Sequence, residues 1–296
     1  HASQGGSMEL PIPYAWMMAL ERPEVPFLLF TEVGRLMDSE YLARFGFLPN
    51  AETGYAPGGL SEGWQAPEGL TEVVTDSLNN PDGLPVGFAR TEDWANERTG
   101  EEVDVLGFTC AACHTGQLNY QGRGIRIEGG PAMTDLGKFR TAVGYALGMT
   151  LLPGRFGRFA DRVLDPGQDA DSLKEAIRGF ISAGQRLQRQ TADIYPTEEG
   201  FSRLDAIGRI GNFVFAEELD PVNFAVSDAP VNFPHIWDTP WLEWVQYNAS
   251  FSQPMMRNAG EAMGVFASVN FDSIDSDEQL FRSTIAAVDL HEMERK

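Results

Sequence analysis

The chain has few lysines, histidines and cysteines, and it has no long apolar run. Three of its 22 cationic residues are lysines (Lys138, Lys174 and Lys296), and 43 acidic residues bring the net charge to -21. Such a charge repels phosphate backbones and anionic lipid surfaces, which argues against a nucleic-acid-binding or membrane-surface protein. No apolar run approaches the roughly 18 residues that a membrane-spanning helix requires, so the sequence excludes such a span.

The remaining composition is that of a folded globular protein. Of its 296 residues, 43% are hydrophobic and 22% are charged, and these proportions exclude wholesale disorder. The length accommodates one large domain or two ordinary ones, and in either case a sizeable core. The acidic surface would attract a basic partner, and salt would weaken that attraction.

Two cysteines, Cys110 and Cys113, are too few and too close for a disulfide framework. They belong to the segment 110–114, Cys-Ala-Ala-Cys-His, which is the attachment pattern for c-type haem. Each thiol adds to a haem vinyl group to form a thioether, and the imidazole of His114 can bind the iron. The chance of this pattern arising at random is on the order of one in ten thousand. One covalent haem c is therefore the predicted cofactor.

The alternatives to haem attachment are a zinc half-site, a redox dithiol and two buried thiols. Zinc needs four ligands, and no second cysteine cluster exists to supply them. A dithiol remains open, although it does not require a histidine after the second cysteine.

Covalent haem also predicts the compartment, because haem is attached to such motifs outside the cytoplasm. We therefore expect a periplasmic or secreted protein. Residues 1–7 have neither the charged start nor the apolar run of a signal peptide, so we expect a mature chain from which the leader was removed.

The distribution of proline, glycine and apolar residues predicts two parts. Residues 1–87 are expected to form an irregular wrapping arm with one helix, and residues 88–296 the c-type haem domain. A short β-hairpin is predicted at 118–127. Helices are predicted at 134–149, 169–192, 200–217, 253–268 and 277–296. The expected fold class is mainly α, a cytochrome c-like haem domain with extensive loops and a small β-hairpin.

Five segments together resemble the amino-terminal haem half of the rubber oxygenase-like dihaem c-type cytochromes. These proteins belong to the wider superfamily of bacterial dihaem cytochrome c peroxidases. The segments are 108–117, 125–132, 203–212, 237–241 and 257–266. The resemblance implies one haem that binds oxygen or peroxide and a second that relays electrons. This chain has one attachment motif, so a second haem would be supplied by another chain. The alternatives are that the second half was lost or that the protein is a one-haem descendant.

The predicted iron ligand is His114, and the other nitrogen of its ring is expected to donate to a carbonyl in the turn at Pro131. An ordinary turn is the alternative at Pro131. His235 is a candidate sixth ligand, although a lone histidine in an apolar loop is more often structural. An open sixth position is another possibility, and thioether ligation by Met255 or Met256 is a third.

The resemblance assigns a catalytic role to Trp237, beside the haem on the route to the second haem. The alternative is that Trp237, Trp241 and Trp244 simply pack in the loop. Partners for the haem propionates are predicted to be Arg123, Arg126 and Arg257. Calcium, as in relatives, is a further candidate at Asp205 and Asn212, although two oxygen ligands are too few to define a site.

Three functions are compatible with these expectations. The first is a periplasmic c-type haem oxidoreductase that activates peroxide or dioxygen, as a haem peroxidase or oxygenase. The second is an electron-transfer cytochrome c subunit of a larger complex, and the third is a haem-stabilised structural subunit. The expected partners are a redox protein and a second haem-bearing chain, without nucleic acid or a membrane span.

Overall fold

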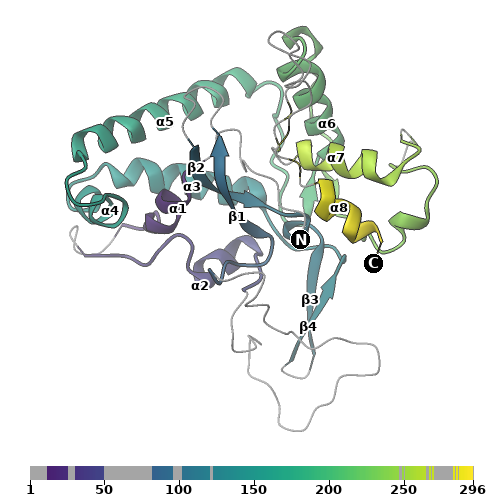
Figure 1. The fold of residues 1–296 in the computed structure, drawn as a ribbon, viewed down its shortest axis with the longest axis horizontal. Helices are drawn as coiled ribbons and strands as arrows, with labels where there is room; N and C mark the ends of the chain where they lie inside the picture. Colours follow the sequence, from purple (N-terminus) through teal and green to yellow (C-terminus); the bar gives the residue numbers. More distant parts are fainter. Residues whose placement is uncertain are drawn as a thin grey trace.

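The computed structural model describes residues 12–25, 31–49, 82–95, 102–120, 123–246, 249, 251–264, 267, 269, 283, 285 and 287–295. Two groups of helices flank the β1–β2 pair of strands (Figure 1). One group holds α1, α3, α4 and α5, and the other holds α6, α7 and α8. Within these ranges no helix has both the length and the apolar character needed to cross a bilayer.

Eight α-helices lie in the described ranges. They are α1 (Tyr14–Ala19), α2 (Ser39–Leu42), α3 (Leu136–Thr150), α4 (Arg155–Val163), α5 (Ala170–Thr191), α6 (Ala206–Gly211), α7 (Pro254–Gly264) and α8 (Ala287–Glu294). A π-helical segment, Asn212–Glu217, continues α6. The helices predicted at 134–149 and 169–192 are confirmed by α3 and α5. Each begins after an aspartate, Asp135 or Asp169, whose carboxylate accepts hydrogen bonds from backbone N–H groups of the first turn.

The strands pair as three small antiparallel sheets. They are β1 (Phe88–Ala95) with β2 (Glu102–Phe108), β3 (Thr115–Tyr120) with β4 (Arg123–Glu128), and β5 (Arg203–Leu204) with β6 (Val231–Asn232). The predicted hairpin is confirmed by β3 and β4, in which Leu118 lies opposite Ile125.

The prediction of a mainly α, cytochrome c-like fold is wrong. Of the residues that the structure describes, 46% are helical and 16% are in strands, which form several small antiparallel sheets, and the fold is not clearly of the cytochrome type. The β1–β2 pair accounts for much of the difference. The sequence of β1 mixes Phe88, Thr91 and Trp94, which favour strands, with alanine and acidic residues, which do not, so its pairing with β2 decides its conformation.

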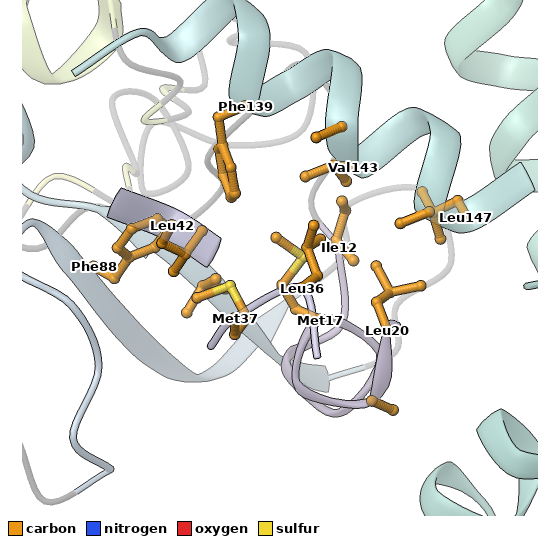
Figure 2. Packing of buried hydrophobic residues seen from close by; sticks show 14 of the residues in the cluster. Ile12, Met17, Leu20, Leu36, Met37, Leu42, Phe88, Phe139, Val143 and Leu147 are labelled. Atoms are coloured by element: carbon orange, nitrogen blue, oxygen red, sulfur yellow. The ribbon is translucent and has the colours of Figure 1, made fainter. Parts of the chain in front are cut away.

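The main core joins the described part of the predicted arm to the helices. Met17 of α1 and the adjacent Leu20 pack with Leu36 against α3, which contributes Phe139 and Val143 (Figure 2). Residues 50–81 of the predicted arm lie outside the described residues. The division at residue 87 stays a prediction, and the described part of the arm belongs to this core.

A cluster of phenylalanines connects this core to the cysteine motif. The ring centroid of Phe47 lies 4.7 Å from that of Phe88 and 5.1 Å from that of Phe139, and Phe88 lies 5.0 Å from Phe108. Aromatic pairs at these separations stabilise a core beyond the area that they bury. Phe108 ends β2, two residues before Cys110, so the cluster holds the start of the motif.

A buried carboxylate fastens the amino-terminal segment to α4. Glu21 accepts hydrogen bonds from Arg158 at 2.7 and 2.8 Å and from Arg162 at 3.2 Å. Its side chain is 4% exposed. Burial opposes ionisation of Glu21, but the two guanidinium groups outweigh burial and lower its pKa below the ordinary 4.5. The ionised carboxylate is therefore a stabilising contact between distant parts of the chain.

We predict that Glu21→Gln lowers the free energy of unfolding by about 3 kcal/mol, because it removes the buried negative charge that Arg158 and Arg162 bind. Urea denaturation at pH 7 measures this loss. The control is Glu175→Gln, which removes the exposed pair with Arg178 and should cost less than about 1 kcal/mol.

The same measurement should depend on pH. Because the pKa of Glu21 is lowered in the folded state, its contribution is complete above the ordinary value of 4.5 and is lost as pH falls through the lowered pKa. The difference between the parent and Glu21→Gln should therefore narrow in acid. A difference that widened in acid would contradict this assignment.

Candidate haem-attachment site

The backbone of the cysteine motif is fixed on both sides. The N–H groups of Cys113 and His114 donate to the carbonyl of Cys110 at 3.2 and 2.9 Å, which closes a tight turn. The carbonyl of Cys113 accepts from Ala132 N–H at 2.9 Å, and that of His114 accepts from Gly129 N–H at 2.9 Å. The chain after the β3–β4 hairpin thus returns to the motif and holds it.

A glycine supports the motif from the other direction. Gly87 has φ +92°, and a Cβ atom there would lie 2.3 Å from Cα of Ala112. Its carbonyl accepts from Thr109 N–H at 2.8 Å. Only glycine permits both the positive φ and this close approach, so the segment before β1 packs directly against the motif.

Both cysteines are free thiols, with Cys110 half-buried and Cys113 buried. Cys113 packs in a small cluster with Ala132, Leu204 and Phe233. Burial raises the pKa of both thiols, and the negative charge of Glu261 raises it further. The structure thus holds two protonated thiols three residues apart, of which Cys110 is the more accessible.

The ring of His114 is oriented by a carbonyl far away in the sequence. Its Nδ1 lies 2.9 Å from the carbonyl oxygen of Pro234, 120 residues along the chain. Because a carbonyl can only accept, Nδ1 carries the proton and Nε2 keeps its lone pair. Burial also lowers the pKa of His114 and favours the neutral ring. A neutral imidazole whose other nitrogen is held by a carbonyl is the usual form of a histidine that binds metal.

The predicted acceptor near Pro131 is thus replaced by Pro234. The carbonyl of Pro131 packs against Gly116 instead, 2.9 Å from the position that a Cβ atom would occupy there. The sequence favours the turn at 129–131 because that turn is close to the motif along the chain. No local pattern indicates a partner 120 residues away.

Trp237 lies beside the motif in the same loop as Pro234. Its Nε1 donates to the carbonyl of Glu128 at 2.7 Å, and the N–H of Ile236 donates to the carbonyl of Gly129 at 3.0 Å. These bonds tie the loop to the end of β4. Trp237 is 56% exposed, so the fixed indole is accessible from solvent.

His235 has the contacts of a structural residue. Its ring stacks on Trp237 with centroids 4.9 Å apart, and its Nε2 lies 3.4 Å from Asp238. Binding of iron by His235 stays a prediction, as does binding by Met255 or Met256 in the first turn of α7.

The three predicted arginines lie on two elements. Arg123 begins β4 and Arg126 lies within it, and Arg257 is on α7. The Nε of Arg126 is buried without a hydrogen-bond partner among the described residues, while its Nη2 donates to the carbonyl of Pro49 at 2.9 Å. Burial lowers its pKa. An orphaned guanidinium N–H of this kind is suited to a carboxylate such as a haem propionate.

The two calcium candidates have structural partners. The carboxylate of Asp205 accepts from Gly208 N–H at 3.1 Å and from the hydroxyl of Ser227 at 2.8 Å, and so caps α6. Asn212 exchanges two hydrogen bonds of 2.9 Å with the backbone of Ala225. In the described part of the chain, no three His, Cys, Asp or Glu side chains are arranged as ligands of one metal ion. Calcium stays a prediction.

Three charged residues near the motif were missed from sequence. Glu261 of α7 accepts from Gln246 at 2.9 Å, and its charge acts on both thiols and on His114. Arg209 and Glu199 form a largely buried ion pair at 2.8 Å, and the charge of Glu199 also acts on Cys113. Arg209 and Glu261 lie in the segments 203–212 and 257–266, and the resemblance expected there from sequence was the only signal for either.

Comparison with known proteins gives one relative without a stated activity. A protein of Sinorhizobium fredii (strain NBRC 101917 / NGR234), described as the uncharacterized protein y4iJ, is 42% identical over 313 residues. The alignment covers 100% of this chain and 46% of the relative, so the chain spans about half the length of that protein. No family model matches the sequence. No solved structure matches it either.

We predict that iodoacetamide modifies Cys110 at least about tenfold faster than Cys113 in the folded chain without attached cofactor, because Cys113 is the buried thiol. Peptide mass spectrometry after timed alkylation at pH 8 measures the two rates. In urea the rates should converge. Equal rates in the folded chain would show that the cluster around Cys113 is open.

A second prediction concerns Gly129, which has φ +73° and whose added Cβ would lie 2.7 Å from Cδ1 and Nε1 of Trp237. Gly129→Ala should displace the indole from the carbonyl of Glu128 and cost about 1–3 kcal/mol. The chemical shift of the Trp237 indole N–H in an NMR spectrum reports the displacement. Gly144→Ala in α3, where a methyl group meets open space, is the control and should leave this signal unmoved.

Proposed function

We propose that the chain is a periplasmic c-type haem oxidoreductase that activates peroxide or dioxygen at a single covalent haem. A second haem, on another chain, would complete the electron path. The observation that supports this most is the 2.9 Å hydrogen bond from His114 Nδ1 to the carbonyl of Pro234. It leaves the lone pair of Nε2 free to bind iron, on the residue that follows the second of two free cysteines in the sequence.

The residues present fit a covalent haem. Cys110 and Cys113 would form the two thioethers, and His114 would bind the iron. Arg126 offers a buried N–H without a partner in the described ranges, which suits a propionate. When bound, the haem would supply a redox-active iron that carries electrons or binds peroxide or dioxygen.

The protein groups have separate tasks in this proposal. The carbonyl of Pro234 fixes the proton of His114 on Nδ1. Leu204 and Phe233 keep water from Cys113, and Phe233 also lies near the imidazole with centroids 6.4 Å apart. The bond from Trp237 to Glu128 holds an indole at fixed orientation beside the motif, where an aromatic ring suits electron transfer or a pocket wall.

The alternative function is an electron-transfer cytochrome c subunit of a larger complex. The exposure of Trp237 favours it, because a fixed and accessible indole beside the motif would give a partner a route to the redox centre. In this alternative His114 and a second side chain would both hold the iron, and the haem would carry electrons without binding peroxide or cyanide.

Expression in a periplasm that contains haem-attachment enzymes tests the proposal. Intact mass should increase by one haem, and the colour should remain with the polypeptide after acid-acetone extraction. Cys110→Ala with Cys113→Ala should abolish both signals. A parent protein that is colourless and has the mass of the bare chain would overturn the proposal.

The ferric absorption spectrum then separates the two functions. High-spin iron that shifts on addition of peroxide or cyanide supports the oxidoreductase, and a low-spin spectrum unaffected by either supports the electron carrier. His114→Ala should alter the spectrum while the thioethers remain. The matched variant His235→Ala should leave the spectrum unchanged unless His235 is the sixth ligand.

A further inference from the structure

Two long stretches of the sequence contain no lysine or arginine, residues 45–89 and residues 210–256, and the second lies almost wholly in the described ranges. Between Arg209 and Arg257, residues 210–256 include six acidic residues and no Lys or Arg, where the average frequency of the chain would give three or four cations. The same segment contains ten of the 18 large hydrophobic side chains that are exposed in the described ranges. Residues 210–256 therefore combine exposed apolar side chains with acidic residues and no lysine or arginine.

Exposed apolar side chains and acidic residues occur together in the loop 237–244. Three of the six tryptophans of the chain lie in these eight residues. Trp237, Trp241 and Trp244 are 56%, 85% and 55% exposed, and Leu242 is 47% exposed. Exposed aromatic side chains gathered in this way mark interaction surfaces, because tryptophan is enriched at protein interfaces and contributes strongly to binding.

The loop is a fixed platform. Its first residue is anchored by the bond from Trp237 Nε1 to Glu128, and the N–H of Trp241 donates to the carbonyl of Asp238 at 3.1 Å. Val245, directly after the loop, is buried and pairs with Phe251. A surface held at both ends loses little conformational entropy when a partner binds.

The charges of the loop select the partner. Asp238 and Glu243 are exposed between the tryptophans, and His235 stacks beside Trp237. A second copy of the chain would bring one net charge of -21 against another. Lysine and arginine side chains pair with carboxylates and also bind over indole faces. The chemistry thus fits a protein whose binding face carries cations around an apolar centre.

We propose that the loop 237–244 is the docking surface for a cationic protein partner. The tryptophans and Leu242 supply the apolar contact, and Asp238 and Glu243 supply attraction and orientation. This inference goes beyond the proposed oxidation chemistry and does not depend on haem, because it rests on exposed residues of the polypeptide.

The test is a calorimetric titration of the full chain with a basic cytochrome c whose exposed haem edge is ringed by lysines. At low ionic strength we expect saturable binding that weakens with salt. Trp241→Ser with Trp244→Ser should weaken binding about tenfold. Asp238→Asn with Glu243→Gln should weaken it about threefold and reduce its dependence on salt.

The control changes two equally exposed apolar residues outside the segment, Tyr145→Ser with Val288→Ser, at 66% and 76% exposure. It should bind like the parent. The proposal is overturned if the parent does not bind, or if the tryptophan variant and the control bind equally, since general charge attraction would then suffice. It is also overturned if size-exclusion chromatography shows a dimer of the chain that the tryptophan variant dissolves.

Discussion

The hydrogen bond between His114 and Pro234 is the contact on which the arrangement of the candidate site depends. It joins the motif to a loop 120 residues later, and it determines which ring nitrogen is free. The same loop contributes Phe233 to the cover of Cys113 and Trp237 to the end of β4. The loop that makes this contact therefore sets the tautomer of His114, covers the thiol of Cys113 and positions the indole of Trp237.

Short segments surround this contact, and aromatic packing, a close glycine approach and backbone hydrogen bonds hold them in place. The phenylalanine cluster holds the end of β2, Gly87 admits the backbone of Ala112, and the carbonyls of Cys113 and His114 bind the chain that returns from the hairpin. Glu21 performs a comparable role at the far side of the core by binding α4. In a chain of net charge -21, arginines are thus used for buried pairing.

The sequence predicted the parts whose signals are local. The cysteine motif is a contiguous pattern, the hairpin has alternation on both arms, and α3 and α5 are long enough for their periodicity to be clear. The β1–β2 pair was missed because the sequence of β1 alone does not specify a strand, and pairing with β2 gives it that conformation. The helix predicted from 200 begins later because 203–204 pair with 231–232, a contact that no local pattern shows. Pro234 and Glu261 were missed for the same reason, since each meets the motif through the tertiary fold.

The cysteine motif lies about a hundred residues before Leu204 and Phe233, which cover Cys113, and this separation along the chain affects when the thiols become buried during synthesis and folding. The ribosome delivers Cys110 and Cys113 well before Leu204 and Phe233, which enclose Cys113 in the finished fold. Until that later stretch emerges, both sulfur atoms are open to solvent and to any enzyme that acts on them. The polypeptide therefore passes through an interval in which its most protected thiol is accessible, and folding of the segment that carries Leu204 and Phe233 ends that interval.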